Sequence, residues 1–289
     1  MADAIAVPRA GLRDFEIHEV ALTTLGVVTT LALIFRPLAW KAVLVEVAVA
    51  TVLYGLAVRL SRGVRNRLRI RLLASYAFAV WFYCAVARIT PALGTELRDG
   101  PLLAIDQTLF GHTPAILFHR AAAPWLTDLL SLCYLAYLLY LPSVVIHAAL
   151  LANAASRRLG MYLFTGFAMG FAGYLLVPAV GPAFAFPELF RGPIPEGAVS
   201  PIVTKLIAAG SSGYDVFPSL HALITCILLD HDRRHVRRRF WVMIGPALGM
   251  LLSTIYLRYH YGVDVIAGLL MFVALRQTFL KVEARTNAL

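Results

Sequence analysis

Long apolar runs separated by short polar breaks dominate the hydrophobicity pattern of this chain. The runs lie near residues 21–37, 42–60, 70–90, 127–151, 160–180, 217–231, 240–257 and 262–281. A helix of about 20 apolar residues is long enough to cross the hydrocarbon core of a bilayer. The pattern therefore predicts an all-α fold, a polytopic membrane helical bundle of about eight spans.

Two longer segments, 91–126 and 181–216, lie between the predicted spans, and the first is too polar to span a membrane. Connections of this length in a compact domain usually carry function. The first segment mixes apolar and charged residues, as an amphipathic helix lying along the membrane interface would. The second contains five prolines and the sequence GSSG at 210–213, which predicts an irregular lid.

These boundaries divide the chain into four parts. Residues 1–90 form a cytoplasmic segment and three spans, and residues 91–126 form the interfacial segment. Residues 127–281 form the membrane catalytic core with the lid at 181–216, and 282–289 form a cytoplasmic tail. We expect a six-helix catalytic core, in which the last six spans surround the site.

Composition and charge support a membrane protein and argue against a nucleic-acid partner. Of 289 residues, 60% are hydrophobic and 15% are charged, and the mean hydropathy is +0.76, which excludes a water-soluble globular chain. The formal net charge is +10, yet the basic residues gather in short breaks between apolar runs rather than on one polar face. We therefore predict a lipid bilayer as the partner and no nucleic acid.

The arginines also predict the topology. Breaks at 59–71, 152–159 and 231–239 hold six, two and five arginines, and eight spans would place all three breaks and both termini on one face. The positive-inside rule assigns that face to the cytoplasm. Segments 91–126 and 181–216 are then extracytoplasmic, in the plasma membrane or an equivalent membrane.

Three ionisable residues lie at predicted mouths of spans on the extracytoplasmic side. His221 belongs to FPSLHA at 217–222, while His260 and Asp264 belong to STIYLRYHYGVDVIAG at 253–268. Ionisable groups in a membrane are costly, so each is a functional candidate. His260 and Asp264 are four residues apart, which places them on one face of a helix.

This set suits a double displacement through phosphohistidine. A carboxylate on one imidazole nitrogen fixes the tautomer and makes the other nitrogen a better nucleophile, and a second histidine can serve as acid and base. Helix N-termini near both histidines favour a phosphate group, and Arg258 is a candidate clamp for its oxygens. Ser219 either binds phosphate or caps the helix that follows it.

The sequences of these motifs resemble those of a known family. PSLH, followed about forty residues later by H-x-x-x-D, is similar to the second and third motifs of the type 2 phosphatidic acid phosphatase superfamily. FPSLHA with YLRYHYGVDVIAG is closer to its inositol phosphorylceramide synthase (aureobasidin-resistance) branch, whose first motif resembles GYLLVPAVGPAF at 173–184. The resemblance covers about half the chain. It implies His260 as nucleophile, Asp264 as its orienting carboxylate and His221 as acid/base.

The chain also departs from the phosphatase pattern. The lysine and arginine of the first motif are absent near Pro178, Thr254 replaces the arginine that opens the third motif, and PSLH replaces PSGH. Lys205 is a candidate substitute for these phosphate-binding residues, and Gly181 is expected to shape the backbone beside the site. The resemblance implies no cofactor and no metal.

The departures favour a lipid phosphotransferase but do not decide between transfer to an alcohol and transfer to water. The resemblance to the synthase branch implies transfer of a phosphoalcohol headgroup from a phospholipid to a lipid alcohol. Transfer to water, with a phospholipid or polyprenyl phosphate as substrate, is the alternative. Two other classes stay open from the residues alone. Two histidines and an aspartate can bind zinc with an open fourth position, as in a metal-dependent hydrolase. The same charges could instead line the pathway of a non-enzymatic transporter.

Overall fold

The structure, a computed structural model, describes residues 15–286 and is helical, with no strand in that range. Eight longer helices make up the bundle: α1 (Ile17–Ile34), α2 (Lys41–Leu60), α3 (Arg67–Leu93), α6 (Pro124–Leu151), α7 (Ala154–Leu176), α10 (Leu220–His235), α11 (Arg237–Tyr256) and α12 (Gly262–Thr286). Shorter elements connect them: η1 (Leu38–Trp40), η2 (Ser61–Gly63), α4 (Asp99–Phe110), α5 (Pro114–Arg120), α8 (Pro182–Ala185), η3 (Pro187–Leu189) and α9 (Ser200–Gly210). The predicted all-α membrane bundle is confirmed.

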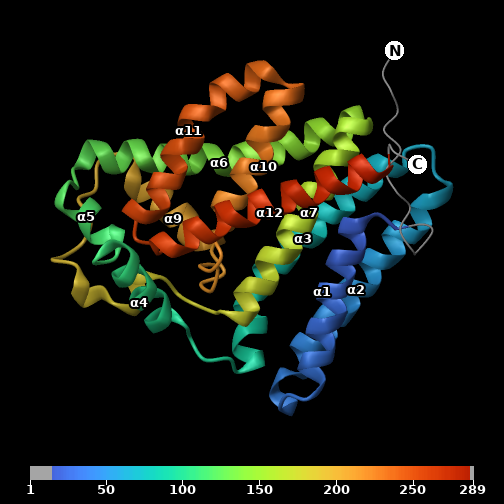
Figure 1. Ribbon diagram of the computed structural model, residues 1–289. Coiled ribbons are helices and arrows are strands. Elements are labelled where there is room, and N and C mark those ends of the chain that lie inside the picture. Colours follow the sequence, from blue (N-terminus) through green and yellow to red (C-terminus); the bar gives the residue numbers. More distant parts are fainter. Residues whose placement is uncertain (1–14, 287–289) are drawn as a thin grey trace.

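Seven helices within the described range are long and apolar enough to cross a membrane. The span predicted at 217–231 is the exception, because α10 has only 16 residues and carries Asp230, Asp232, Arg233 and Arg234 near its end. It nevertheless packs among α7, α11 and α12 (Figure 1). Large apolar side chains on the outer helices, such as Leu53 and Leu139, are exposed, as expected for contact with lipid.

The arginine-rich breaks gather at one end of the bundle. At this end Glu16, just before α1, pairs with Arg157 of α7, with Oε1 and Nε 2.8 Å apart. Asp230 of α10 lies 3.8 Å from Nε of Arg276 in α12. The first turn of α1 and the last turns of α12 also lie at this end (Figure 1). In the break at 59–71, Nε of Arg69 donates to the carbonyl of Ala149 at 3.0 Å, so the three basic breaks share one end.

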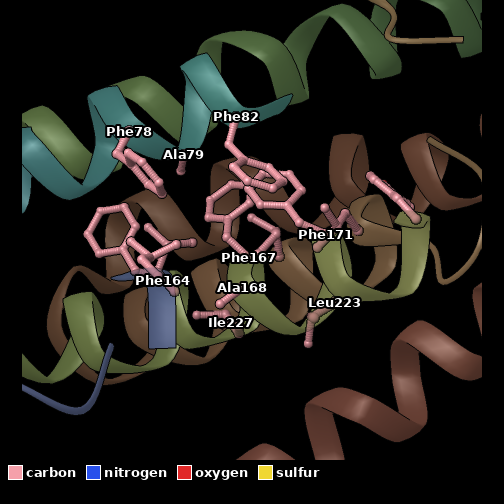
Figure 2. Close-up of a cluster of buried hydrophobic side chains, with 14 of the residues drawn as sticks. Phe78, Ala79, Phe82, Phe164, Phe167, Ala168, Phe171, Leu223 and Ile227 are labelled. Atoms are coloured by element: carbon pink, nitrogen blue, oxygen red, sulfur yellow. The ribbon is translucent and has the colours of Figure 1, made fainter. Parts of the chain in front are cut away.

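A stack of aromatic side chains fixes α7 between α3 and α10 (Figure 2). Phe82 of α3 and Phe171 of α7 have ring centroids 5.2 Å apart and are both fully buried. Leu223 and Ile227 of α10 lie against the other side of α7. Because a close-packed interior resists displacement, this core positions the beginning of α10.

The two long segments are more regular than the sequence suggests. Segment 91–126 contains two short helices, separated at Gly111, which adopts a left-handed conformation with φ of 78°. The expectation of an irregular lid is wrong over Ser200–Gly210, which forms α9. Pro201 fits the first turn of this helix, and Val203 and Ile207 are buried on its side, which packs against α6. Apolar residues four apart thus favour a helix despite the surrounding prolines.

Candidate active site

His221, His260 and Asp264 form a continuous chain of hydrogen-bonding contacts at the end opposite the arginine-rich breaks. His221 lies in the first turn of α10, Asp264 lies in the first turn of α12, and His260 lies in the loop between α11 and α12. Nδ1 of His221 is 3.2 Å from Nε2 of His260, and Nδ1 of His260 is 3.4 Å from Oδ2 of Asp264. The structure therefore brings the three predicted residues together in the order His221, His260 and Asp264.

The backbone around these residues is closely tied. Ser219 is the N-cap of α10, and its hydroxyl accepts from the N–H of Ala222 at 3.3 Å. The N–H of Ser219 donates to the carbonyl of Asp264 at 3.0 Å, which joins the first turns of α10 and α12. Pro218 precedes the cap, and the Phe217–Pro218 peptide is cis. Of the two roles considered for Ser219, the structure shows the cap.

Burial controls the protonation state of His260. Its side chain is about 1% exposed, and burial lowers its pKa to about 4, although the negative charge of Asp215 partly opposes this shift. An imidazole with this pKa is neutral at pH 7, and a neutral ring has one nitrogen lone pair available for attack. Its neighbour Asp264 is fully buried and accepts from the N–H of Tyr261 at 2.8 Å.

Two buried aspartates of α4 hold the loops around the site. The carboxylate of Asp106 accepts from the N–H groups of Gly262 and Val263, at 2.9 and 2.8 Å, and so satisfies free donors at the start of α12. Asp99 accepts from the Tyr261 hydroxyl at 2.9 Å. Neither role was predicted from the sequence. The signal present was a pair of acids seven residues apart, and hence on one helical face, in an otherwise apolar stretch.

Gly181 lies against the loop that carries His260. Its φ is 90°, and an added Cβ would lie 2.5 Å from the carbonyl oxygen of Tyr259, so a larger residue would displace the loop that carries His260. Its N–H donates to Asp99 at 2.9 Å. That donor is therefore engaged by the protein rather than directed toward a phosphate group.

Arg258 is held by the lid. One terminal nitrogen donates to the carbonyl of Gly192 at 2.9 Å, the other is 2.6 Å from Nδ1 of His119, and the guanidinium lies 4.1 Å from the centroid of the Phe190 ring. The side chain is about 7% exposed, and the residue has a left-handed φ of 64°. The predicted phosphate clamp thus lies two residues from His260 but has its terminal nitrogens engaged elsewhere.

Lys205 is exposed on α9, although its neighbour Thr204 forms a side-chain hydrogen bond with Tyr259, next to His260. Lys205 itself makes no hydrogen bond or ion pair with any residue that the structure describes. No contact links it to either histidine. Its predicted role as a substitute phosphate ligand gains no support from its position.

Asp215 is a further acid near the site that the sequence reasoning did not select. The Tyr83 hydroxyl donates to one oxygen of this half-buried carboxylate, and the Ser211 hydroxyl donates to the other at 3.0 Å. The charge of Asp215 acts on both His221 and His260. It lies in the sequence GYDVFPSLH, directly before the first histidine motif, and this proximity was the available signal.

The candidate residues are arranged in series. Both ring nitrogens of His260 are directed at protein neighbours, one at Asp264 and one at His221. Across the described part of the chain, no group of three or more His, Cys, Asp or Glu residues has the arrangement of a metal site. The geometry resembles a proton-transfer chain more than a set of ligands converging on one point.

Comparison with known proteins gives one family. A model described as the PAP2 superfamily matches residues 100–276, more than half of the chain, and the match contains His221, His260 and Asp264. Searches of curated proteins and of solved structures return no match. Membership in this superfamily supports an activity of the lipid-phosphate phosphatase or phosphotransferase type. The predicted superfamily is confirmed, and the chain belongs to the PAP2 superfamily.

Proposed function

We propose that this protein is an integral membrane lipid phosphotransferase that works through a phosphohistidine on His260. It would move a phosphoalcohol headgroup from a phospholipid to a lipid alcohol, as in the inositol phosphorylceramide synthase-like branch. The observation that supports this most strongly is the chain of contacts from His221 through His260 to Asp264. It combines a nucleophile, its orienting carboxylate and a second imidazole beside the attacking nitrogen.

In the first half-reaction, Nε2 of His260 attacks the phosphorus and the bond to the leaving lipid oxygen breaks. His221, which begins this step protonated on both nitrogens, gives its Nδ1 proton to that oxygen and becomes neutral, and Asp264 stabilises the positive charge that develops on His260. The substrate phosphate must enter between the two histidines and replace their 3.2 Å contact. Arg258 could then bind phosphate oxygens only after leaving Gly192 in the lid or His119 in α5.

In the second half-reaction, His221 takes a proton from the acceptor hydroxyl. The acceptor oxygen attacks phosphorus, the bond between phosphorus and Nε2 breaks, and His260 returns to its neutral state. His221 then holds the proton needed for another cycle. Every step uses residues of this chain, so the route requires no cofactor and no metal.

Burial supports transfer to a lipid alcohol over transfer to water. His260 is about 1% exposed, Asp264 is fully buried, and segment 181–216 lies over the loop that carries Arg258. A site that excludes water protects a reactive intermediate from hydrolysis. Hydrolysis of a lipid or polyprenyl phosphate is the second candidate function, supported by the family itself.

The same proposal includes an orientation. The arginine-rich breaks lie at the end of the bundle opposite the histidines, and such breaks are retained in the cytoplasm. We therefore place both termini in the cytoplasm and the site at the extracytoplasmic face of the plasma membrane or an equivalent membrane.

The test is turnover by the purified protein in liposomes. The assay would contain phospholipids labelled in the headgroup, together with diacylglycerol or ceramide as acceptor. Wild type should form labelled acceptor lipid, and His260→Ala should form none. His147→Ala is a matched control, because His147 also lies in a membrane helix but has no contact with the site. Water-soluble label without acceptor product would favour the hydrolase.

Two further results would overturn the proposal. If His260→Ala retained turnover of every phospholipid and polyprenyl phosphate tested, the nucleophile would be wrong. If a chelator abolished turnover and zinc restored it, a metal-dependent hydrolase would replace the proposed mechanism. Solute counterflow that survives His221→Ala, in the absence of any turnover, would instead identify a transporter.

A further inference from the structure

Tyr134 of α6 contacts Nε2 of His221, the ring nitrogen that is turned away from His260. Its hydroxyl oxygen is 2.7 Å from Nε2 of His221, and the two ring centroids are 5.0 Å apart. The side chain is about 5% exposed, so water has little access to this hydrogen bond. The contact extends the chain to four groups, Tyr134, His221, His260 and Asp264.

The carboxylate at one end of this chain determines where each proton lies. An ionised carboxylate can only accept, so Nδ1 of His260 must carry hydrogen where it faces Asp264. In neutral His260, Nε2 is then an acceptor, and Nδ1 of His221 must donate to it. Neutral His221 consequently has an unprotonated Nε2, which accepts from the Tyr134 hydroxyl.

From this order we infer that Tyr134 is a positioning residue, whose hydroxyl reserves Nδ1 of His221 for proton transfer at the phosphate. The inference rests on the proposed function and adds a residue that touches neither the nucleophile nor its carboxylate. Without this hydroxyl, Nε2 of His221 loses its partner in both protonation states, and the ring loses the hydrogen bond that sets its orientation.

A hydroxyl suits this position because it can both donate and accept. When His221 carries two protons, its Nε2–H donates to the Tyr134 oxygen while Nδ1–H faces the leaving oxygen. After the Nδ1 proton has moved to the leaving group, the remaining proton stays on Nε2, still bonded to Tyr134. Nδ1 is then free to take the proton of the acceptor alcohol, and neither half-reaction requires the ring to turn.

Tyr137 provides a matched control from the same helix. It lies one turn after Tyr134, it is also buried at about 8% exposure, and its ring centroid is 5.2 Å from that of His221. Its contact with His221 is between the rings, whereas the hydroxyl contact to Nε2 belongs to Tyr134. A change at Tyr137 therefore alters packing around His221 but leaves the hydrogen bond in place.

The experiment compares Tyr134→Phe and Tyr137→Phe on two kinds of substrate. One is a phospholipid whose leaving group is an alkyl alcohol, which needs a proton. The other is the matching nitrophenyl phosphodiester, whose phenolate leaves without one. Because proton donation is typically worth about 10²–10⁴-fold, Tyr134→Phe should lower kcat by at least about tenfold on the alkyl substrate. Because the acceptor step also uses His221, the aryl substrate is followed by the release of nitrophenol in the first turnover, which precedes that step. This release and KM should stay within about threefold of wild type, and Tyr137→Phe should change neither rate comparably.

An equal loss on both substrates, or no loss on the alkyl substrate, would overturn the role of Tyr134. Failure of the proposed function itself would look different, because wild type would turn over neither substrate or His260→Ala would remain active. A measurement on wild type covers the case in which Tyr134→Phe does not fold. In ¹⁵N-histidine NMR spectra, with His221→Ala used for assignment, His221 should be protonated on Nδ1 in the resting neutral state. The opposite tautomer would contradict the inference.

Discussion

Two polar clusters join α6 to α10. Comparing them distinguishes a candidate active site, at His221, from a structural support, at Asp232. In each cluster a tyrosine of α6 reaches a polar residue of α10. Tyr134 contacts His221 at 2.7 Å, and Tyr140 donates to Oδ2 of Asp232 at 2.8 Å. The second cluster also includes Arg239, whose Nε donates to Asp232 at 2.6 Å.

The difference between the clusters lies in how their charges are compensated. Asp232 is fully buried and ion-paired with Arg239, so its charge is neutralised within the cluster. The first cluster ends at Asp264, which pairs with no lysine or arginine of the described chain and whose Oδ1 has no hydrogen-bond partner there. A compensated buried charge supports a fold, whereas an incompletely satisfied one is typical of a functional site.

We expect the largest decrease in kcat from a change at Asp264, the carboxylate of the first cluster. Asp264→Asn retains the size of the side chain but removes the charge that orients His260 and stabilises its positive form. By analogy with the carboxylate of serine hydrolases, kcat should fall by about 10³–10⁴-fold. Lipid turnover measured alongside a melting temperature would check this, and a decrease of less than tenfold in a folded variant would contradict it.

A change at Asp232, in the second cluster, should lower the stability of the protein rather than kcat. Asp232→Asn leaves Arg239 without its buried counter-charge, and breaking such a pair typically costs about 3–5 kcal/mol. We expect the free energy of unfolding in detergent to decrease by about this amount, while kcat per folded molecule changes little. A loss of kcat without loss of stability would show that the clusters do not divide the two roles in this way.

The pH dependence of the reaction tests the environment of His260. Burial lowers its pKa from 6.5 to about 4, and attack requires the unprotonated ring. Activity limited by this group should therefore fall as pH decreases through about 4, by about tenfold per pH unit below it. Because the folded pKa is below the unfolded value, the corresponding stability is present above pH 6.5 and is lost as pH falls toward 4. A midpoint near 6.5 in the rate profile would contradict the buried environment.

The smallest effect is expected at Lys205. This lysine is exposed on α9 and lies outside both clusters. Surface substitutions remote from a site usually change stability by less than about 0.5 kcal/mol, and we expect kcat/KM of Lys205→Ala to stay within about twofold of wild type. A tenfold loss would show that Lys205 does take part in binding the phosphate.

The sequence predicted features that depend on local spacing. His260 and Asp264 could be paired because they are four residues apart, and the arginine-rich breaks indicated which helix ends share a face. The roles of Tyr134 and Asp106 depend instead on contacts across 87 and 156 residues. Periodicity contains no information about such pairings. The helix α9 was missed for another reason, since nearby prolines concealed the apolar spacing that buries one of its sides.

The central claim is a covalent intermediate on His260, and intact-protein mass spectrometry tests it most directly. Wild type, His260→Ala and His221→Ala would each be incubated briefly with mixed phospholipids and quenched in alkali, which preserves phosphohistidine. The account predicts a phosphoalcohol or phosphate adduct that requires His260 and accumulates in His221→Ala, and the mass of the adduct would identify the transferred group. An adduct that persists in His260→Ala, or wild-type turnover with no adduct in any variant, would contradict the phosphohistidine mechanism.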